Sequence, residues 1–327
     1  MRRLNWYWAI ALTAACAVSA RTSSAADDAA KPADTAPHVV FVTGDCEYRS
    51  EVSMPLMAKI LEAHHGMRTS IAYAVDEKTG KPAPKYLANI DGLDALASAD
   101  VAVFFIRFRQ LPDAQLKQIL DYANSGKPLV GLRTATHSFR YSGGPSAEWN
   151  DRFGEEFFGQ RWLRHHGHDS STNVYVAVGD HPICRGLAPE FHARSWLYHV
   201  VPLVGDCTPL LVGGAVKGET PRKDGATFGT VNPVAWTKMR GDARTFFTTL
   251  GHPQDFADES MRRLLVHGIY WALGREAQIP AEGAKVDLVG EYVPPPTTRA
   301  VPDPTLRPDR ERSYALEDEG SPQGSGN

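Results

Sequence analysis

Cysteine is scarce in this 327-residue chain, and neither sign of charge dominates. Of its four cysteines, Cys16 lies in an N-terminal apolar stretch, which leaves Cys46, Cys184 and Cys207. Three cysteines do not form a disulfide framework, so we expect either one bridge with a free thiol or three reduced thiols. With a formal net charge of −3, the chain does not have the excess of basic residues that is typical of nucleic-acid-binding domains. We therefore expect no nucleic-acid partner.

An apolar stretch long enough for a persuasive membrane span is also missing. Two arginines precede an apolar stretch over residues 6–18, and small residues follow through position 26. This pattern predicts a signal peptide over residues 1–26 and export to the periplasm or the extracellular space. Thr13 stands where lipoprotein signals usually have Leu, which disfavours lipidation of Cys16. Residues 27–37 are predicted to be a flexible linker.

Apolar runs suited to buried strands alternate with helical patterns in the first half of the chain. The predicted strands are HVVFVT, TSIAYAV, DVAVFFIRF and LVGLR, and helices are predicted to begin at Ser50 and at Leu111-Pro112. Nearly continuous apolar strands separated by helices predict a mostly parallel sheet with helices on both faces. The expected fold is therefore an α/β domain over residues 38–279.

Later strand candidates follow one another too closely for crossover helices. They are TNVYVAV, TPLLVG, NPVAWTKM and RTFFTTLG, and they predict an antiparallel extension of the sheet. A final amphipathic helix is predicted over residues 258–273. Residues 280–327 are predicted to be a Pro-rich C-terminal tail, partly wrapped on the surface and partly disordered.

Polar side chains follow several of the predicted strands. Ligands bind outside the carboxyl ends of the strands in open α/β sheets, so these residues are expected at one edge. Guanidinium groups suit carboxylates, phosphates or vicinal hydroxyls. The residues predicted to bind substrate here are Glu47, Tyr48, Arg49, Arg107, Arg133 and Thr134.

Two histidines are candidates for proton transfer. His252 ends a strand, and Pro253 fixes the turn after it; Gln254 or Asp255 is expected to orient its imidazole. His137 lies four residues beyond Arg133, on the expected first turn of a helix, and is either a packed histidine or a general base.

A metal ion and a reactive thiol remain open. The segment LRHHGHD offers His165, His166, His168 and Asp169, which need another strand-end ligand to hold a transition metal; a solvated polar loop is the alternative. Cys46 beside Arg49 is either a nucleophile or an inert thiol. No particular cofactor is indicated, and metal dependence is unknown.

Several stretches resemble the ThuA-like (trehalose-utilisation) family of the class I glutamine amidotransferase-like superfamily. They span about residues 38–276 and include GDCEYRSE, GKPLVGLRTATHSF, EWNDRFGEEFFGQRWLRHHG and TTLGHPQDF. The resemblance implies a flavodoxin-like fold and a role in sugar metabolism, notably on keto-derivatives of disaccharides. The matching motifs contain Arg49, Arg107, Arg133, Thr134, His137, His166 and His252, which adds His166 to the predicted substrate-binding residues.

The same resemblance shows two departures. Cys46 stands where relatives tend to have an acidic residue. Arg133 stands where the glutaminases have their nucleophilic Cys, so acyl-enzyme chemistry on glutamine has no nucleophile at this corner.

The leading hypothesis is an exported enzyme that isomerises or cleaves a keto-sugar or keto-glycoside by acid/base chemistry. The alternative is a non-catalytic carbohydrate-binding or scaffold domain. In this alternative, Tyr48, Tyr141, Trp149, Trp162 and Trp196 are the aromatic residues that stack on sugar rings. A glutaminase would require Cys46 to replace the missing thiol in space. A small-molecule carbohydrate ligand is expected, and the oligomeric state is open.

Overall fold

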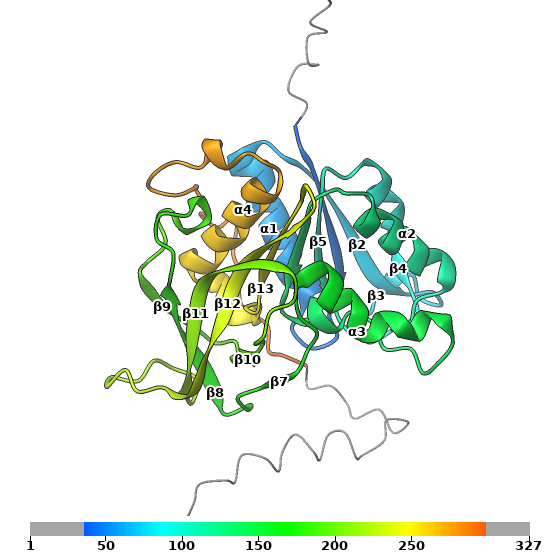
Figure 1. Cartoon of the computed structure of the whole chain (residues 1–327). Coiled ribbons are helices and arrows are strands. Elements are labelled where there is room, and N and C mark those ends of the chain that lie inside the picture. The colour runs from blue at the N-terminus through cyan, green and yellow to red at the C-terminus, as the bar shows by residue number, and fades with distance from the viewer. Residues whose placement is uncertain (1–35, 299–327) are drawn as a thin grey trace, which may run out of the picture. The chain divides into compact units, whose positions relative to one another are not determined.

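The computed structural model describes residues 36–298 of the chain (Figure 1). The predicted signal peptide, nearly all of the predicted linker, and the tail beyond residue 298 lie outside the described residues. Within residues 36–298, no helix is both long and apolar enough to cross a membrane.

Five parallel strands form the centre of the main sheet. Their order is β2 (Arg68–Asp76), β1 (His38–Gly44), β5 (Val101–Ile106), β6 (Leu129–Leu132) and β13 (Ala243–Thr248). Every residue of β1, β5 and β6 is buried, as expected for strands that are covered on both faces. The predicted parallel sheet is confirmed.

Antiparallel strands continue the sheet beyond β13. They are β12 (Phe228–Arg240), β11 (Asp206–Lys217), β8 (Ser170–Val176) and β9 (Glu190–Ala193). At the other edge, β3 (Lys81–Pro82) and β4 (Ile90–Asp91) pair with β2. Two short strands, β7 (Arg164–His165) and β10 (Tyr198–His199), form a separate ribbon. The predicted antiparallel extension is confirmed.

Helices cover both faces of the sheet (Figure 1). The helices α1 (Ser50–His65) and α4 (Glu259–Ala272) pack on one face, and α2 (Asp113–Asn124) and α3 (Trp149–Phe153) pack on the other. Alternate residues of each strand enter the two cores; Val39 and Phe41 face α1, whereas Val40 and Val42 face the opposite side. The flavodoxin-like α/β class expected from the sequence is therefore confirmed.

The carboxyl ends of the parallel strands deliver four loops to one edge of the sheet. One correction concerns the loop after β6, which was expected to start a helix. It forms only the five-residue 3-10 turn η2 (Arg133–His137). The chain then becomes extended because backbone bonds join Ser138 and Arg140 to Arg109, and this pairing replaces helix propagation.

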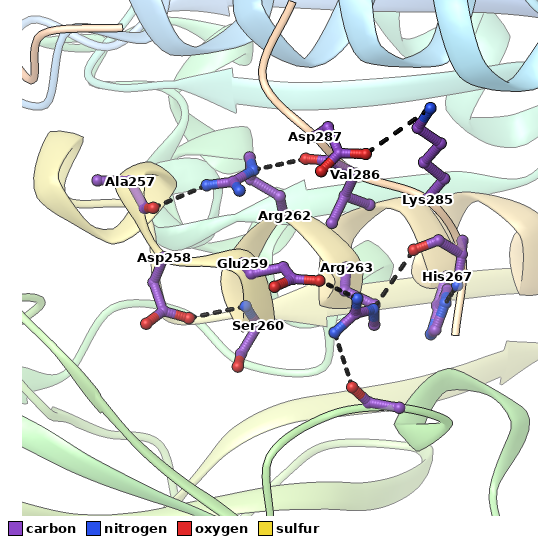
Figure 2. Close-up of polar contacts among 12 residues, drawn as sticks. Ala257, Asp258, Glu259, Ser260, Arg262, Arg263, His267, Lys285, Val286 and Asp287 are labelled. Atoms are coloured by element: carbon purple, nitrogen blue, oxygen red, sulfur yellow. Dashed lines mark hydrogen bonds and ion pairs between the residues drawn. The ribbon is translucent and has the colours of Figure 1, made fainter. Parts of the chain in front are cut away.

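The final described segment, residues 280–298, contains no helix or strand. It lies against α1 and α4. Ala284 and Val286 are buried there. We call this segment the C-terminal strap; Figure 2 shows part of its attachment to α4.

Candidate functional site

A buried carboxylate organises the loop after β1. One oxygen of Asp45 accepts the backbone N–H groups of Glu47 and Tyr48, and the other accepts the hydroxyl of Thr134. The Ser50 hydroxyl accepts the backbone N–H of Asp45 at 2.9 Å. These bonds fix Glu47 and Tyr48 beside the η2 turn. The hydroxyl of Thr134 is used in this contact with Asp45.

Arg133 has the left-handed φ of 42° that strained corner residues adopt, but its side chain is fully buried. Its guanidinium donates to the Thr249 carbonyl at 2.9 Å and to the Tyr48 hydroxyl at 3.0 Å. It also lies 4.2 Å from the ring centroid of Tyr48 and 4.7 Å from that of Tyr198. Arg133 therefore touches these rings and carbonyls, and its contacts can act on a ligand through Tyr48 and Tyr198.

The hydroxyl of Tyr48 links Arg133 to Glu47. Burial raises the pKa of Tyr48 well above its usual range, so the hydroxyl remains protonated near neutral pH. It accepts a hydrogen bond from Arg133, and its own proton serves the Glu47 carboxylate, where this bond lowers the pKa of Glu47. The predicted binding role of Tyr48 is compatible with this arrangement and stays a prediction.

Glu47 and Arg107 form a nearly buried ion pair at 3.1 Å. Burial raises the pKa of Glu47, and the Arg107 charge opposes that rise. Arg107 also donates to the Cys46 sulfur at 3.4 Å and lies 4.2 Å from the ring centroid of Phe108. The two predicted binding residues Glu47 and Arg107 therefore meet at the carboxyl ends of the strands. Because its pKa is raised, Glu47 can take up and release a proton nearer to neutral pH than an exposed glutamate.

The hydroxyl of Thr136 lies between two groups, the Arg133 carbonyl at 3.2 Å and Nδ1 of His137 at 3.0 Å. When this hydroxyl donates to the carbonyl, Nδ1 of His137 donates to the hydroxyl and Nε2 bears a lone pair. When the hydroxyl donates to Nδ1, the proton of the ring lies on Nε2. Burial, followed by nearby arginines, lowers the pKa of His137 well below its usual value. The ring is neutral and lies beside Phe108.

His252, by contrast, has a defined tautomer. It caps η6 (Pro253–Ala257), and its Nδ1 accepts the backbone N–H of Gln254 at 3.2 Å. Nε2 therefore carries the proton. Burial lowers the pKa of His252 to about 4, although Asp255 opposes the shift. Gln254 thus orients the imidazole, as one prediction proposed, through its backbone amide.

Asp255 holds the loop of His252 and not the imidazole. Its carboxylate accepts the backbone N–H groups of Gly251 and His252 at 3.0 and 2.9 Å. It also accepts the N–H of Arg194 at 2.7 Å and the hydroxyl of Ser195. The Asp255 carboxylate thus holds the segment before β10, at Arg194 and Ser195, against the carboxyl ends of the strands.

The segment around β7 and β10 supplies Tyr198, which the sequence interpretation did not single out, and His165, which it considered only as a metal ligand. His165 pairs with Tyr198 across the ribbon, and its ring lies 5.1 Å from that of Trp196. Burial lowers the pKa of His165 to about 3. The neighbouring His166, which was predicted to bind substrate, stacks on His199 at 3.9 Å. Its binding role stays a prediction, and His165 occupies the place beside the site.

Arg49 also lies apart from Arg133 in its described contacts. Arg49 has a φ of 60° and pairs with Glu51 at 2.5 Å. Arg49 and Glu51 border an open hollow of about 370 Å³, whose other lining residues are Ala83, Pro84, Lys85 and Thr298.

The described contacts connect the remaining predicted residues into one cluster. The rings of Tyr48 and Tyr198 both lie on the Arg133 guanidinium. The ring of His252 is 6.2 Å from that of Tyr48, and the ring of His137 is 6.4 Å from that of Tyr198. The cluster contains Glu47, Tyr48, Arg107, Arg133, Thr134, His137 and His252. Among residues 36–298, no three His, Cys, Asp or Glu side chains gather to hold a metal ion.

The sheet order and the strand-end site define a flavodoxin-like α/β protein. A family model described as ThuA, trehalose utilisation, matches residues 38–272, and the chain belongs to the ThuA family. No curated protein matches the sequence significantly.

Two solved ThuA-like proteins are similar in structure. The protein from Parabacteroides merdae ATCC 43184 has a TM-score of 0.51 and 17% identity, over 77% of this chain and 98% of its own. The protein from Bacteroides uniformis ATCC 8492 has a TM-score of 0.48 and 19% identity, over 74% and 94%. At these identities, the likeness to the Parabacteroides merdae protein supports the fold alone.

Proposed function

We propose that this protein is an exported enzyme that acts on a keto-sugar or keto-glycoside by acid/base chemistry. The observation that supports it best is the pair of buried, neutral histidines in the cluster. In the proposed tautomer of His137, Nδ1 donates to Thr136 and Nε2 bears a lone pair, whereas Nε2 of His252 bears a proton. One is suited to accept a proton, and the other to donate a hydrogen bond.

A keto group acidifies the neighbouring C–H bond, so this pair suffices for enolisation. His137 takes the proton, and the C–H electron pair moves to form an enolate. The enolate oxygen then accepts a hydrogen bond from His252. The sugar isomerises when the proton is delivered to the former carbonyl carbon, while the hydroxyl on the deprotonated carbon passes its proton to the enolate oxygen and becomes the new carbonyl.

Cleavage follows from the same intermediate. In a 3-keto-glycoside the glycosidic oxygen is bonded to the carbon β to the carbonyl. Collapse of the enolate expels that oxygen, which takes up a proton as the C–O bond breaks. Glu47, whose pKa is raised by burial, is the group suited to supply that proton.

Sugar as the substrate class is supported by the description of the family, trehalose utilisation. Export is supported by the residue pattern at positions 1–26. Glutaminase chemistry is not proposed because Arg133 stands at the corner. The Cys46 sulfur contacts arginine side chains, and within residues 36–298 no histidine base is described beside it.

The test is proton exchange and cleavage of a 3-keto-disaccharide in D₂O, followed by NMR. The wild-type protein is expected to exchange the C–H next to the keto group and to release product. His252→Asn retains a capping oxygen for the Gln254 amide but removes the Nε2 proton. It should lower the rate by about 100-fold or more.

The chain offers a matched control. His181 also precedes a proline, caps the 3-10 turn η5 (Pro182–Cys184), and accepts the Ile183 amide on Nδ1 at 3.2 Å. His181→Asn should retain full activity because its described ring neighbour is Trp271 on α4. Equal losses in both variants would remove His252 from the mechanism. Tight calorimetric binding of the keto-sugar without exchange or product would favour the non-catalytic alternative.

A further inference from the structure

The C-terminal strap is fastened by side chains and not by a sheet or helix. Four successive carbonyls, at positions 284–287, each accept a hydrogen bond from a side chain of α1 or α4. The donors are Arg263 to Ala284 (3.4 Å), His65 to Lys285 (2.8 Å), Arg262 to Val286 (2.8 Å) and His64 to Asp287 (3.0 Å). We call these contacts the latch. Figure 2 shows Arg262 and Arg263 beside the strap.

A fifth contact fixes the direction of the strap. The buried His267 accepts the backbone N–H of Ala284 at 2.8 Å and bonds the Ile183 carbonyl at 3.0 Å. The buried backbone groups of Ala284 and Val286 need such partners, and the surface bonds of His65 and His64 add to them, so these contacts together determine the path of the strap. A chain segment without a structural role would not need these contacts.

Beyond the latch, the strap contacts two loops of the candidate site. The hydroxyl of Tyr292 donates to the carbonyl of Pro253 at 2.8 Å, next to His252. Thr298 donates its backbone N–H to the Glu47 carbonyl at 2.9 Å and its hydroxyl to the Cys46 carbonyl at 2.5 Å. The strap therefore touches the loop of each proposed proton donor, His252 and Glu47.

The family model ends at residue 272, so the strap lies outside the matched part of the chain. We propose that Tyr292 and Thr298 are positioning residues of this protein. Through them the strap holds the loops of His252 and Glu47 in their working geometry. The expected effect on keto-sugar turnover rests on the proposed acid/base activity, whereas the expected effects on hydrogen exchange and on the His252 titration do not.

The decisive perturbation is remote from the site. His64 and His65 end α1, and Glu47 precedes its start; a 16-residue helix is about 24 Å long. In the double variant His64→Ala/His65→Ala, hydrogen exchange is measured by mass spectrometry on peptides that cover residues 45–49, 251–257 and 284–287. We expect exchange to be about tenfold faster in all three peptides, the factor that corresponds to the loss of one or two hydrogen bonds.

Local variants test the two contacts directly. Tyr292→Phe should accelerate exchange in residues 251–257 by about three- to tenfold, and Thr298→Val should do the same for residues 45–49. Two controls should change neither peptide. Val293→Ser alters a strap side chain that is 70% exposed, and Tyr86→Phe removes a hydroxyl that is bonded to Glu77.

A second readout separates positioning from general stability. A looser η6 turn admits water to His252, so in Tyr292→Phe its NMR titration should move upward from about 4. On a 3-keto-disaccharide, kcat should fall by about tenfold with KM little changed. Tyr86→Phe should alter neither value.

The proposal is overturned if the double variant frees residues 284–287 while both loop peptides and the His252 titration stay as in the wild type. The strap would then be a surface cover. If no keto-sugar is turned over, the proposed function fails, but exchange and titration still decide the role of the strap.

Discussion

The stability of this protein in mildly acidic solution should depend on the buried histidines whose pKa is strongly lowered, and His267 is the one of these that lies outside the candidate site. His267 is fully buried between the Ile183 carbonyl and the Ala284 amide. Burial lowers its pKa from 6.5 to about 4, and nearby cations act in the same direction; they are Arg263, His65 and Arg185. The Ala284 amide points at Nε2, so a proton there would face another donor.

The sign and size of the effect follow from the shift. The unfolded chain binds the proton below pH 6.5, whereas the folded chain resists it down to about 4. The stabilising contribution is therefore complete above pH 6.5 and is lost as the pH falls towards 4. A difference of about 2.5 pKa units corresponds to roughly 3 kcal/mol, a large part of the stability of a typical domain.

The assay is urea unfolding of the wild type and of His267→Gln between pH 7 and pH 4. The variant starts from a lower stability because it loses part of the bridge, but it should lose about 3 kcal/mol less than the wild type across that range. Equal losses in the two proteins would refute the reasoning. If the variant does not fold, direct NMR titration of His267 in the wild type replaces it, and a pKa near 6.5 in the folded protein would refute the reasoning equally.

Two further predictions follow from buried contacts. Thr136→Val removes the hydroxyl that is bonded to Nδ1 of His137, so it should destabilise the fold by about 2 kcal/mol and lower keto-sugar turnover by at least about tenfold, as measured by urea unfolding and NMR. Unchanged turnover would argue against His137 as the base. Gly154→Ala places a Cβ 2.3 Å from the Thr136 carbonyl and should destabilise the protein by about 2 kcal/mol or more, whereas Gly179→Ala meets nothing within 4 Å and should be nearly neutral in thermal unfolding. Similar melting temperatures for the two alanine variants would contradict the packing argument.

Much of the fold could be predicted from the sequence because its central strands are almost wholly buried. Continuous apolar runs such as VAVFFI identify a covered parallel strand without any knowledge of its neighbours. The start of α1 at Ser50 was also predictable, and the structure places it there. The two-residue β7 and β10 were not, because no periodic pattern exists over such a length.

The candidate site could be predicted only where strand ends defined it. Arg133 was expected to extend towards a ligand, but its main acceptors are the carbonyl of Thr249 and the hydroxyl of Tyr48, and no local pattern in the sequence indicates such partners. Trp196 and Tyr198 reach the site because the buried Asp255 binds the chain just before them. Contacts of this kind depend on tertiary packing and become visible only in the folded chain.

The order of strands in the sheet also determines when the site can form. β13 is the last strand within residues 36–298, yet it lies between β6 and β12, where Leu132 pairs with Thr248. A ribosome-bound chain that ends before Ala243 can hold the earlier parallel strands, but it lacks the neighbour that brings His252 beside Arg133. Because distant pairings form slowly and domains fold as synthesis proceeds, the half-site around Arg133 and His137 waits for the synthesis of β13. Until then the emerging chain has Glu47 and His137 but lacks the hydrogen-bond donor His252.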